Sequence, residues 1–220
     1  MHVYEAVATR RAVRAFTGRP VPAAVLHRVL QAAARAPSGG NIQPWHVYVL
    51  TGARLAELKK RTGERVAAGD QGDEPEFGMY PPGLTSPYHE RRFAAGQQRY
   101  DALGIARDDH RARAAAVAAN WDCFGAPAAL FCYIDRGMGR TQWADIGMYL
   151  QTVMLLLRAE GLHSCPQKAW PVYHRTVAGV VAAPDHLMLV CGLSIGYEDT
   201  AAAPTRTDRA PLSETVTFLG

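Results

Sequence analysis

The sequence lacks the patterns that would place it in several large classes of protein. No window approaches the roughly 18 consecutive apolar residues of a membrane-spanning helix. The formal net charge is only +4 and the basic residues are scattered, so no positively charged stripe is present. We therefore expect neither a membrane nor a nucleic acid as a partner, and we expect a cytoplasmic protein.

Paired cysteines and metal-binding motifs are also missing. The 4 cysteines are far apart and the 8 histidines include no His-Glu-x-x-His pair, so neither a disulfide framework nor a zinc site is indicated. Gly137 and Gly139 begin a Gly-x-Gly pattern, but Gln142 stands where a dinucleotide motif needs its third glycine. Ser38 lies outside the Gly-x-Ser-x-Gly context of a hydrolase nucleophile. A hydrolase is therefore weakly supported.

Apolar residues are plentiful, at 48% of 220 residues, which suffices for one sizeable core. We predict a single domain over residues 1–220 in which helices and strands are mixed along the chain. Helices are expected at 3–9, 22–35, 53–67, 88–104, 108–122, 143–161 and 173–182, and strands at 46–50, 126–134 and 186–197. Residues 69–87, rich in glycine, proline and acids, predict a long irregular excursion, and such loops are usually functional or disordered.

The stretch RAPSGGNIQPW, residues 35–45, holds more glycine than the end of a helix needs. Gly39 and Gly40 permit a close approach to the backbone and a positive φ. Ser38 and Asn41 add short polar side chains, so the loop could bind an anion or the edge of a planar heterocycle. A capped helix end followed by a turn has the same spacing, and the residues alone leave both interpretations open.

Five segments, taken in order, resemble the nitroreductase family of FMN flavoproteins. They are RRAVRAFTGRPVP, RAPSGGNIQPWHVYVL, NWDCFGAPAAL, WADIGMYLQTVMLLLRAEGLHSCPQKAW and RTDRAPLSETVTF, and they cover nearly the whole chain. The resemblance implies an α+β fold with a mixed central sheet wrapped by helices. It also implies an intertwined homodimer with two FMN at the interface, in which the tail, 198–220, reaches the partner subunit.

The resemblance further implies which residues hold FMN. Arg10 is expected at the phosphate or the ribityl chain, and Arg14 at the pyrimidine edge, where a cation stabilises the negative charge of a reduced flavin. Arg206 and Arg209 are expected at the phosphate, with Arg209 the better match. The full set is Arg10, Arg11, Ala12, Arg14, Pro37, Ser38, Gly39, Asn41, Asn120, Pro166, Gln167, Lys168, Ala169, Arg206 and Arg209.

Some of these matches carry expectations of their own. The loop 37–41 would cover the flavin of the other subunit, Asn120 would bond the pyrimidine ring, and the backbone of 166–169 would face flavin N5. Ala12 replaces the usual serine, so only its backbone N–H remains as a donor there. Arg11 is the weakest of the basic cluster, with surface charge as the alternative.

The activity implied is passage of a hydride from NAD(P)H, through flavin N5, to nitroaromatic, quinone or similar electron-poor acceptors, with ping-pong kinetics and no catalytic side chain. Other chemistries occur on the same fold, namely reductive dehalogenation, azoline dehydrogenation and flavin fragmentation by oxygen. A non-enzymatic FMN-binding sensor is a further alternative.

Residues 69–113 are expected to form a lid that sets the choice of a small aromatic acceptor. Tyr80, Arg91, Arg92 and Phe93 are its candidate contacts. Adjacent helical residues diverge by about 100°, so at most one of the two arginines should face the site. Alternatively, both lie on a solvated helix face.

Overall fold

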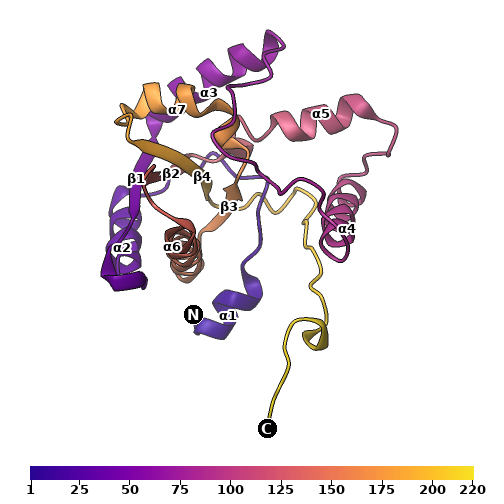
Figure 1. Ribbon diagram of the computed structural model, residues 1–220. Helices are drawn as coiled ribbons and strands as arrows, with labels where there is room; N and C mark the ends of the chain where they lie inside the picture. Colours follow the sequence, from indigo (N-terminus) through magenta and orange to yellow (C-terminus); the bar gives the residue numbers. More distant parts are fainter.

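A four-stranded antiparallel sheet in the order β1-β2-β4-β3 forms the centre of the computed structural model, which describes residues 1–220 (Figure 1). The strands are β1 Trp45–Thr51, β2 Ala128–Asp135, β3 His163–Gln167 and β4 Leu187–Gly196. The helices are α1 Val3–Thr9, α2 Ala23–Ala33, α3 Gly52–Ala67, α4 Tyr88–Ala102, α5 His110–Ala118, α6 Arg140–Ala159 and α7 His174–Val181. Short 3₁₀ turns lie at Gly39–Asn41, Cys123–Gly125, Trp170–Tyr173 and Leu212–Glu214. Every predicted helix is present, within a few residues of its expected ends.

The central strand β2 is buried on both faces, which explains its unbroken apolar sequence. Successive side chains of a strand point to opposite faces. Leu130 and Ile134 join a core with α2 and α6, whereas Phe131 and Tyr133 join a second core with α3 and α7. Figure 1 shows these two pairs of helices on opposite sides of the sheet, with α4 and α5 set apart as an arm.

A β-bulge in β4 changes which of its side chains face each core. Cys191 pairs with Cys132, but the next pair is Leu189 with Tyr133, so Val190 is the extra residue. Leu189 packs with α3 and α7, and Cys191 packs on the other side with α2 and α6. The strand therefore supplies apolar residues to both cores from odd-numbered positions.

The edge strand β3 is an element that the sequence did not predict, and it positions the basic N-terminal segment. Its outer side meets this segment through a parallel bridge between Ala12 and Ser164, where the Val13 N–H donates to the Ser164 carbonyl at 3.1 Å. Pro166 lies in β3, which is possible because an edge strand pairs on one side only. Parallel pairing is confined to this bridge, so within one chain the four strands are antiparallel rather than mixed.

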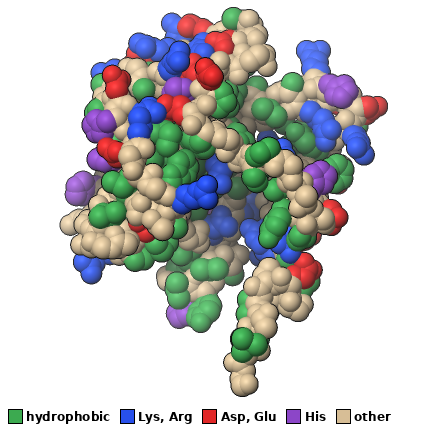
Figure 2. All heavy atoms as spheres, in the orientation of Figure 1, with side chains coloured by type: hydrophobic (Ala, Val, Ile, Leu, Met, Phe, Trp, Pro, Cys, Tyr) green, Lys and Arg blue, Asp and Glu red, His purple; other side chains and the backbone are tan.

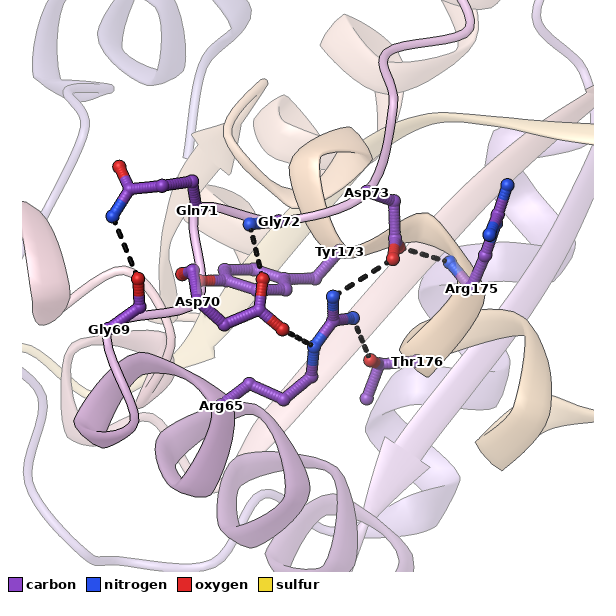
Figure 3. A network of polar contacts seen from close by, with 9 residues as sticks. All are labelled: Arg65, Gly69, Asp70, Gln71, Gly72, Asp73, Tyr173, Arg175 and Thr176. Atoms are coloured by element: carbon purple, nitrogen blue, oxygen red, sulfur yellow. Dashed lines mark hydrogen bonds and ion pairs between the residues drawn. The ribbon is translucent and has the colours of Figure 1, made fainter.

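The excursion 69–87 forms no helix or strand, as predicted, and its beginning is fixed by Arg65 of α3 (Figure 3). The guanidinium bonds to Asp70 at 2.7 Å, to Asp73 at 3.0 Å and to the Thr176 hydroxyl of α7 at 2.8 Å. The hydrogen bond to Asp70, with the two negative charges, raises the pKa of Arg65 above its ordinary value. The excursion therefore leaves the body from a point tied to both α3 and α7.

Three further features concern membranes, metals and thiols. No helix is both long and apolar enough to cross a membrane. No group of three or more His, Cys, Asp or Glu side chains is arranged to hold a metal ion. All four cysteines are free and buried, and burial raises the pKa of each thiol.

Substitution by alanine is predicted to destabilise the protein at Gly192 of β4 but not at Gly63 of α3. A Cβ added there would overlap Cδ1 of Trp170, which is fully buried. Gly192→Ala is therefore expected to lower the free energy of unfolding by about 1–3 kcal/mol, measured by urea denaturation. Gly63 lies on exposed α3, where an added Cβ meets nothing within 4 Å, so Gly63→Ala should stabilise by up to about 1 kcal/mol. Equal unfolding midpoints for the two variants would contradict the packing argument.

Candidate functional site

A cavity of about 490 Å³ lies between the end of α1, the segment that follows it, β3 and the C-terminal tail. We call it the arginine cavity. It brings together seven of the residues predicted to bind the cofactor, which are Arg10, Arg11, Ala12, Arg14, Pro166, Arg206 and Arg209. Figure 2 shows Lys and Arg side chains gathered around a hollow between the body of the molecule and the α4 side.

The two walls of the arginine cavity come from opposite ends of the chain. The bridge between Ala12 and Ser164 fixes the N-terminal wall against β3. On the other wall, Arg206 donates to the Ala8 carbonyl at the end of α1 at 3.3 Å. Arg209 donates at 2.9 Å to the carbonyl of Thr207, two residues earlier in the tail. The arginines therefore meet because the tail crosses α1.

Arg10 and Arg209 face the arginine cavity without a carboxylate between them. Neither forms an ion pair within the chain, and Arg209 bonds only to oxygens of the neighbouring tail residues. Burial and the positive charge of Arg209, in that order, lower the pKa of Arg10. Two guanidiniums that repel each other provide a site that an anion such as a phosphate would stabilise.

Arg11 differs from its neighbours because its charge is already compensated. It forms an ion pair with Glu198, whose other oxygen lies 3.3 Å from Nε2 of His163 on β3. Burial, the largest cause, lowers the pKa of His163. Arg11 therefore contributes more to holding the start of the tail against β3 than to the potential of the cavity.

A second cavity, of about 310 Å³, shares Arg11, Arg14 and Thr205 with the first. Its other lining residues come mainly from α4, α5 and residues 198–203. We call it the alanine cavity, because four alanines of α5 and its C-terminal end line it: Ala112, Ala115, Ala116 and Ala119. The two cavities therefore meet on either side of Arg14.

Comparison with known proteins identifies the family. The sequence model of the Nitroreductase family matches residues 7–197. A 4-nitrobenzoate reductase of Nocardioides sp. (strain LMS-CY) is 38% identical over 216 residues, which are 96% of this chain and 87% of that protein. The chain belongs to the nitroreductase family.

Solved structures of nitroreductases agree with this fold along its whole length. The FMN and NADPH-dependent nitroreductase NfnB from sphigopyxis sp. strain HMH matches with a TM-score of 0.96 and 46% identity, over 100% of both chains. The FMN-dependent NfnB from Mycobacterium smegmatis, in complex with NADPH, matches with a TM-score of 0.93 and 33% identity, over 99% and 98% of the two chains. The predicted family and the α+β fold class are confirmed.

The glycine loop of this nitroreductase, residues 37–41, lines neither cavity of its own chain. Gly40 takes the positive φ of 58° that its sequence permits. The Gly39 N–H donates to the buried carboxylate of Asp145 on α6 at 3.3 Å, and the Ser38 hydroxyl accepts from the Gln43 N–H at 3.0 Å. Pro37, Ser38, Gly39 and Asn41 are thus held on the α6 side of the molecule.

Two predicted polar contacts are occupied within the chain. Gln167 is buried and donates to the Asn120 carbonyl at 2.8 Å, while its own oxygen accepts from the Ser194 hydroxyl. The Asn120 side chain donates to the Val117 carbonyl at 2.8 Å. Within the predicted segment 166–169, Pro166 lines the arginine cavity, whereas Lys168 is exposed in the turn after β3 and Ala169 is half-buried.

The four candidate acceptor contacts, Tyr80, Arg91, Arg92 and Phe93, line neither cavity. Arg91 forms an ion pair with Glu214 of the tail at 2.7 Å, and the Arg92 guanidinium lies 4.1 Å from the centre of the Tyr80 ring. Phe93 is 54% exposed. The two arginines take different partners, as helical geometry predicts, and neither lines the alanine cavity.

Several residues that line the cavities were not predicted from the sequence, among them Gln151 of α6, Thr207 of the tail and Arg99 of α4. Gln151 lies on α6, whose many buried apolar residues predict a helix of the core rather than a site. Arg99 carried no sequence signal, since α4 contains several other charged residues. What distinguishes Arg99 is its half-buried position, which depends on how α4 packs against α5 and the tail.

Proposed function

We propose that this chain is an FMN-dependent oxidoreductase that takes reducing equivalents from NAD(P)H and passes them to nitroaromatic, quinone or similar electron-poor acceptors. The observation that carries the proposal is the pair Arg10 and Arg209, two cations that share a cavity without a counterion, in a member of the nitroreductase family. The cavity volume of about 490 Å³ lies within the range of roughly 300–1,000 Å³ typical of ligand sites.

The residues present fit a phosphate-bearing flavin. Arg10, Arg206 and Arg209 would hold its phosphate, because guanidiniums bind phosphate oxygens through charge-assisted hydrogen bonds. Arg14 would lie along the ring, where a cation favours added negative charge, and Pro166 would form part of the wall. Bound FMN would supply hydride transfer at N5, and the protein residues would bind and orient the reactants.

We further propose a homodimer with two FMN, in which the partner subunit's glycine loop completes each site. This proposal is supported by the loop 37–41, which lines neither cavity of its own chain. It is also supported by large exposed apolar side chains at both ends of the chain, including Tyr4 at 79% and Phe218 at 83% exposure. We assign the reaction to the cytoplasm, a reducing compartment compatible with four free thiols.

The proposal is tested on the purified protein, by its flavin absorption spectrum and by its rate of NADPH oxidation. We expect bound FMN to copurify, and NADPH oxidation to accelerate when nitrobenzene or a benzoquinone is added. Initial rates at several NADPH and acceptor concentrations should give parallel double-reciprocal lines, as expected when both substrates use one face in turn. FMN binding without acceptor-dependent oxidation of NADPH or NADH would refute this function and favour a flavin-binding sensor or another chemistry of the same fold.

A further inference from the structure

Arg99 of α4 is a half-buried cation for which the chain provides no counterion. It lines the alanine cavity beside Arg14. Its Nη2 donates to the Ala116 carbonyl at 2.7 Å, and its Nε is buried without a partner. Arg14 has only a long contact of 3.4 Å, to the Ala12 carbonyl. Neither guanidinium pairs with a carboxylate.

Two acidic residues also line the alanine cavity, and only Glu198 is compensated by an ion pair. Glu198 pairs with Arg11 and lies next to His163. The Asp199 carboxylate accepts from the Ala201 N–H at 3.0 Å. Three arginines and two carboxylates therefore line the cavity, which leaves one positive charge in excess, and Arg99 on the α4 wall has no carboxylate paired with it.

The two free cations point to the same place. Burial and the charge of Arg14, in that order, lower the pKa of Arg99. Burial raises the pKa of the Cys165 thiol on β3 to about 11, and the positive charges of Arg14 and Arg99 oppose that rise. Arg14 also lines the arginine cavity, so Arg99 lies in the same cavity as a residue at which the two cavities meet.

Most of the remaining lining of the alanine cavity is apolar, and the cavity is of the right size for a single ring. Four alanines from α5 and its C-terminal end form one wall, and Val13, Leu103 and Phe124 contribute to the others. Its volume of about 310 Å³ is at the small end of the range for ligand sites. An apolar chamber with two cations at one side suits a small amphipathic anion.

We propose that this site recognises aromatic monocarboxylates, with the carboxylate bound by Arg99, the positive potential of Arg14 beside it, and the ring against the α5 alanines. The inference rests on the proposed function, since it names an acidic nitroaromatic as a favoured acceptor. Arg91 and Arg92, which were predicted to contact the acceptor, are instead engaged by Glu214 and Tyr80.

The experiment compares Arg99→Gln with wild type as FMN-loaded enzymes. Benzoate, which cannot be reduced, is titrated calorimetrically, and kcat/KM is measured for 4-nitrobenzoate and nitrobenzene. Loss of a charge-assisted contact should weaken benzoate binding and 4-nitrobenzoate kcat/KM by about ten- to a hundredfold, with a much smaller loss for nitrobenzene. Arg99→Lys keeps the charge and should recover part of the affinity. Arg111→Gln removes a charge from exposed α5, where the side chain has no polar contact, and should resemble wild type.

Each result decides the inference separately from the proposed function. Unchanged benzoate affinity in Arg99→Gln, or equal losses with both acceptors, overturns it. A fall in FMN content caused by both Arg99 variants also overturns it, since Arg99 would then serve the cofactor. If wild type reduces neither a nitroaromatic nor a quinone, the proposed function fails, and benzoate titration still tests the site.

Discussion

Replacing Arg209 with alanine is expected to weaken FMN binding by about ten- to a hundredfold. Burial and the positive charge of Arg209 lower the pKa of Arg10 in the arginine cavity, and a phosphate between the two guanidiniums would be attracted by both. Removing one charge-assisted pair typically costs about 1.5–3 kcal/mol, which corresponds to that loss of affinity. The measurement is titration of apoprotein with FMN, followed by flavin fluorescence.

The effect of Arg209→Ala on the melting temperature should differ between the apoprotein and the FMN-loaded protein. Without an anion, Arg209 repels Arg10, so Arg209→Ala should leave the melting temperature of the apoprotein unchanged or raise it. In saturating FMN the variant should melt below wild type, because a weaker ligand stabilises less. Arg111→Ala, which removes an exposed charge outside both cavities, is the matched control. An FMN affinity equal to that of wild type would refute the phosphate assignment.

The spacing of apolar residues along the sequence was enough to predict the helices and the longer strands. The helix expected at 3–9 is α1, and the apolar run at 126–134 became β2, which is buried on both faces. The family of the chain was predicted from five sequence segments that occur in the expected order. Motif matching could name Arg10 and Arg209, which come from opposite ends of the chain, but could not show that they share a cavity without a counterion.

The features that escaped prediction depend on tertiary contacts. β3 is five residues long, contains Pro166 and is stabilised by pairing with β4 and by the Ala12 bridge. The bulge at Val190 leaves the apolar composition of β4 unchanged, so no pattern marks it. Arg99 became half-buried only because α4 packs near α5 and the tail, and α4 itself has no buried residue. The spacing of apolar residues shows which face of a helix is buried. A binding site also depends on which helices and strands pack together, and that spacing does not show this.

The proposed dimer rests partly on the exposed apolar residues of the C-terminal tail, so removing the end of the tail is its strongest test. Figure 1 shows residues after the 3₁₀ turn at Leu212–Glu214 running away from the body of the molecule. Leu212, Phe218 and Leu219 are 62%, 83% and 93% exposed, which leaves an apolar terminus without cover in one chain.

Deleting residues 212–220 is therefore expected to weaken dimerisation by at least a hundredfold. Burying a large apolar side chain contributes about 1.5–3 kcal/mol, so even two of the three lost side chains account for that change. Light scattering over a dilution series should find dimeric wild type and a monomeric truncated chain, which should also retain less FMN because each site would lack the partner's loop. Glu214→Gln breaks only the exposed pair with Arg91, a contact worth about 0–1 kcal/mol, and should stay dimeric. A wild-type monomer that holds FMN at stoichiometry would exclude this assembly, and a truncated chain as dimeric as wild type would move the interface away from the tail.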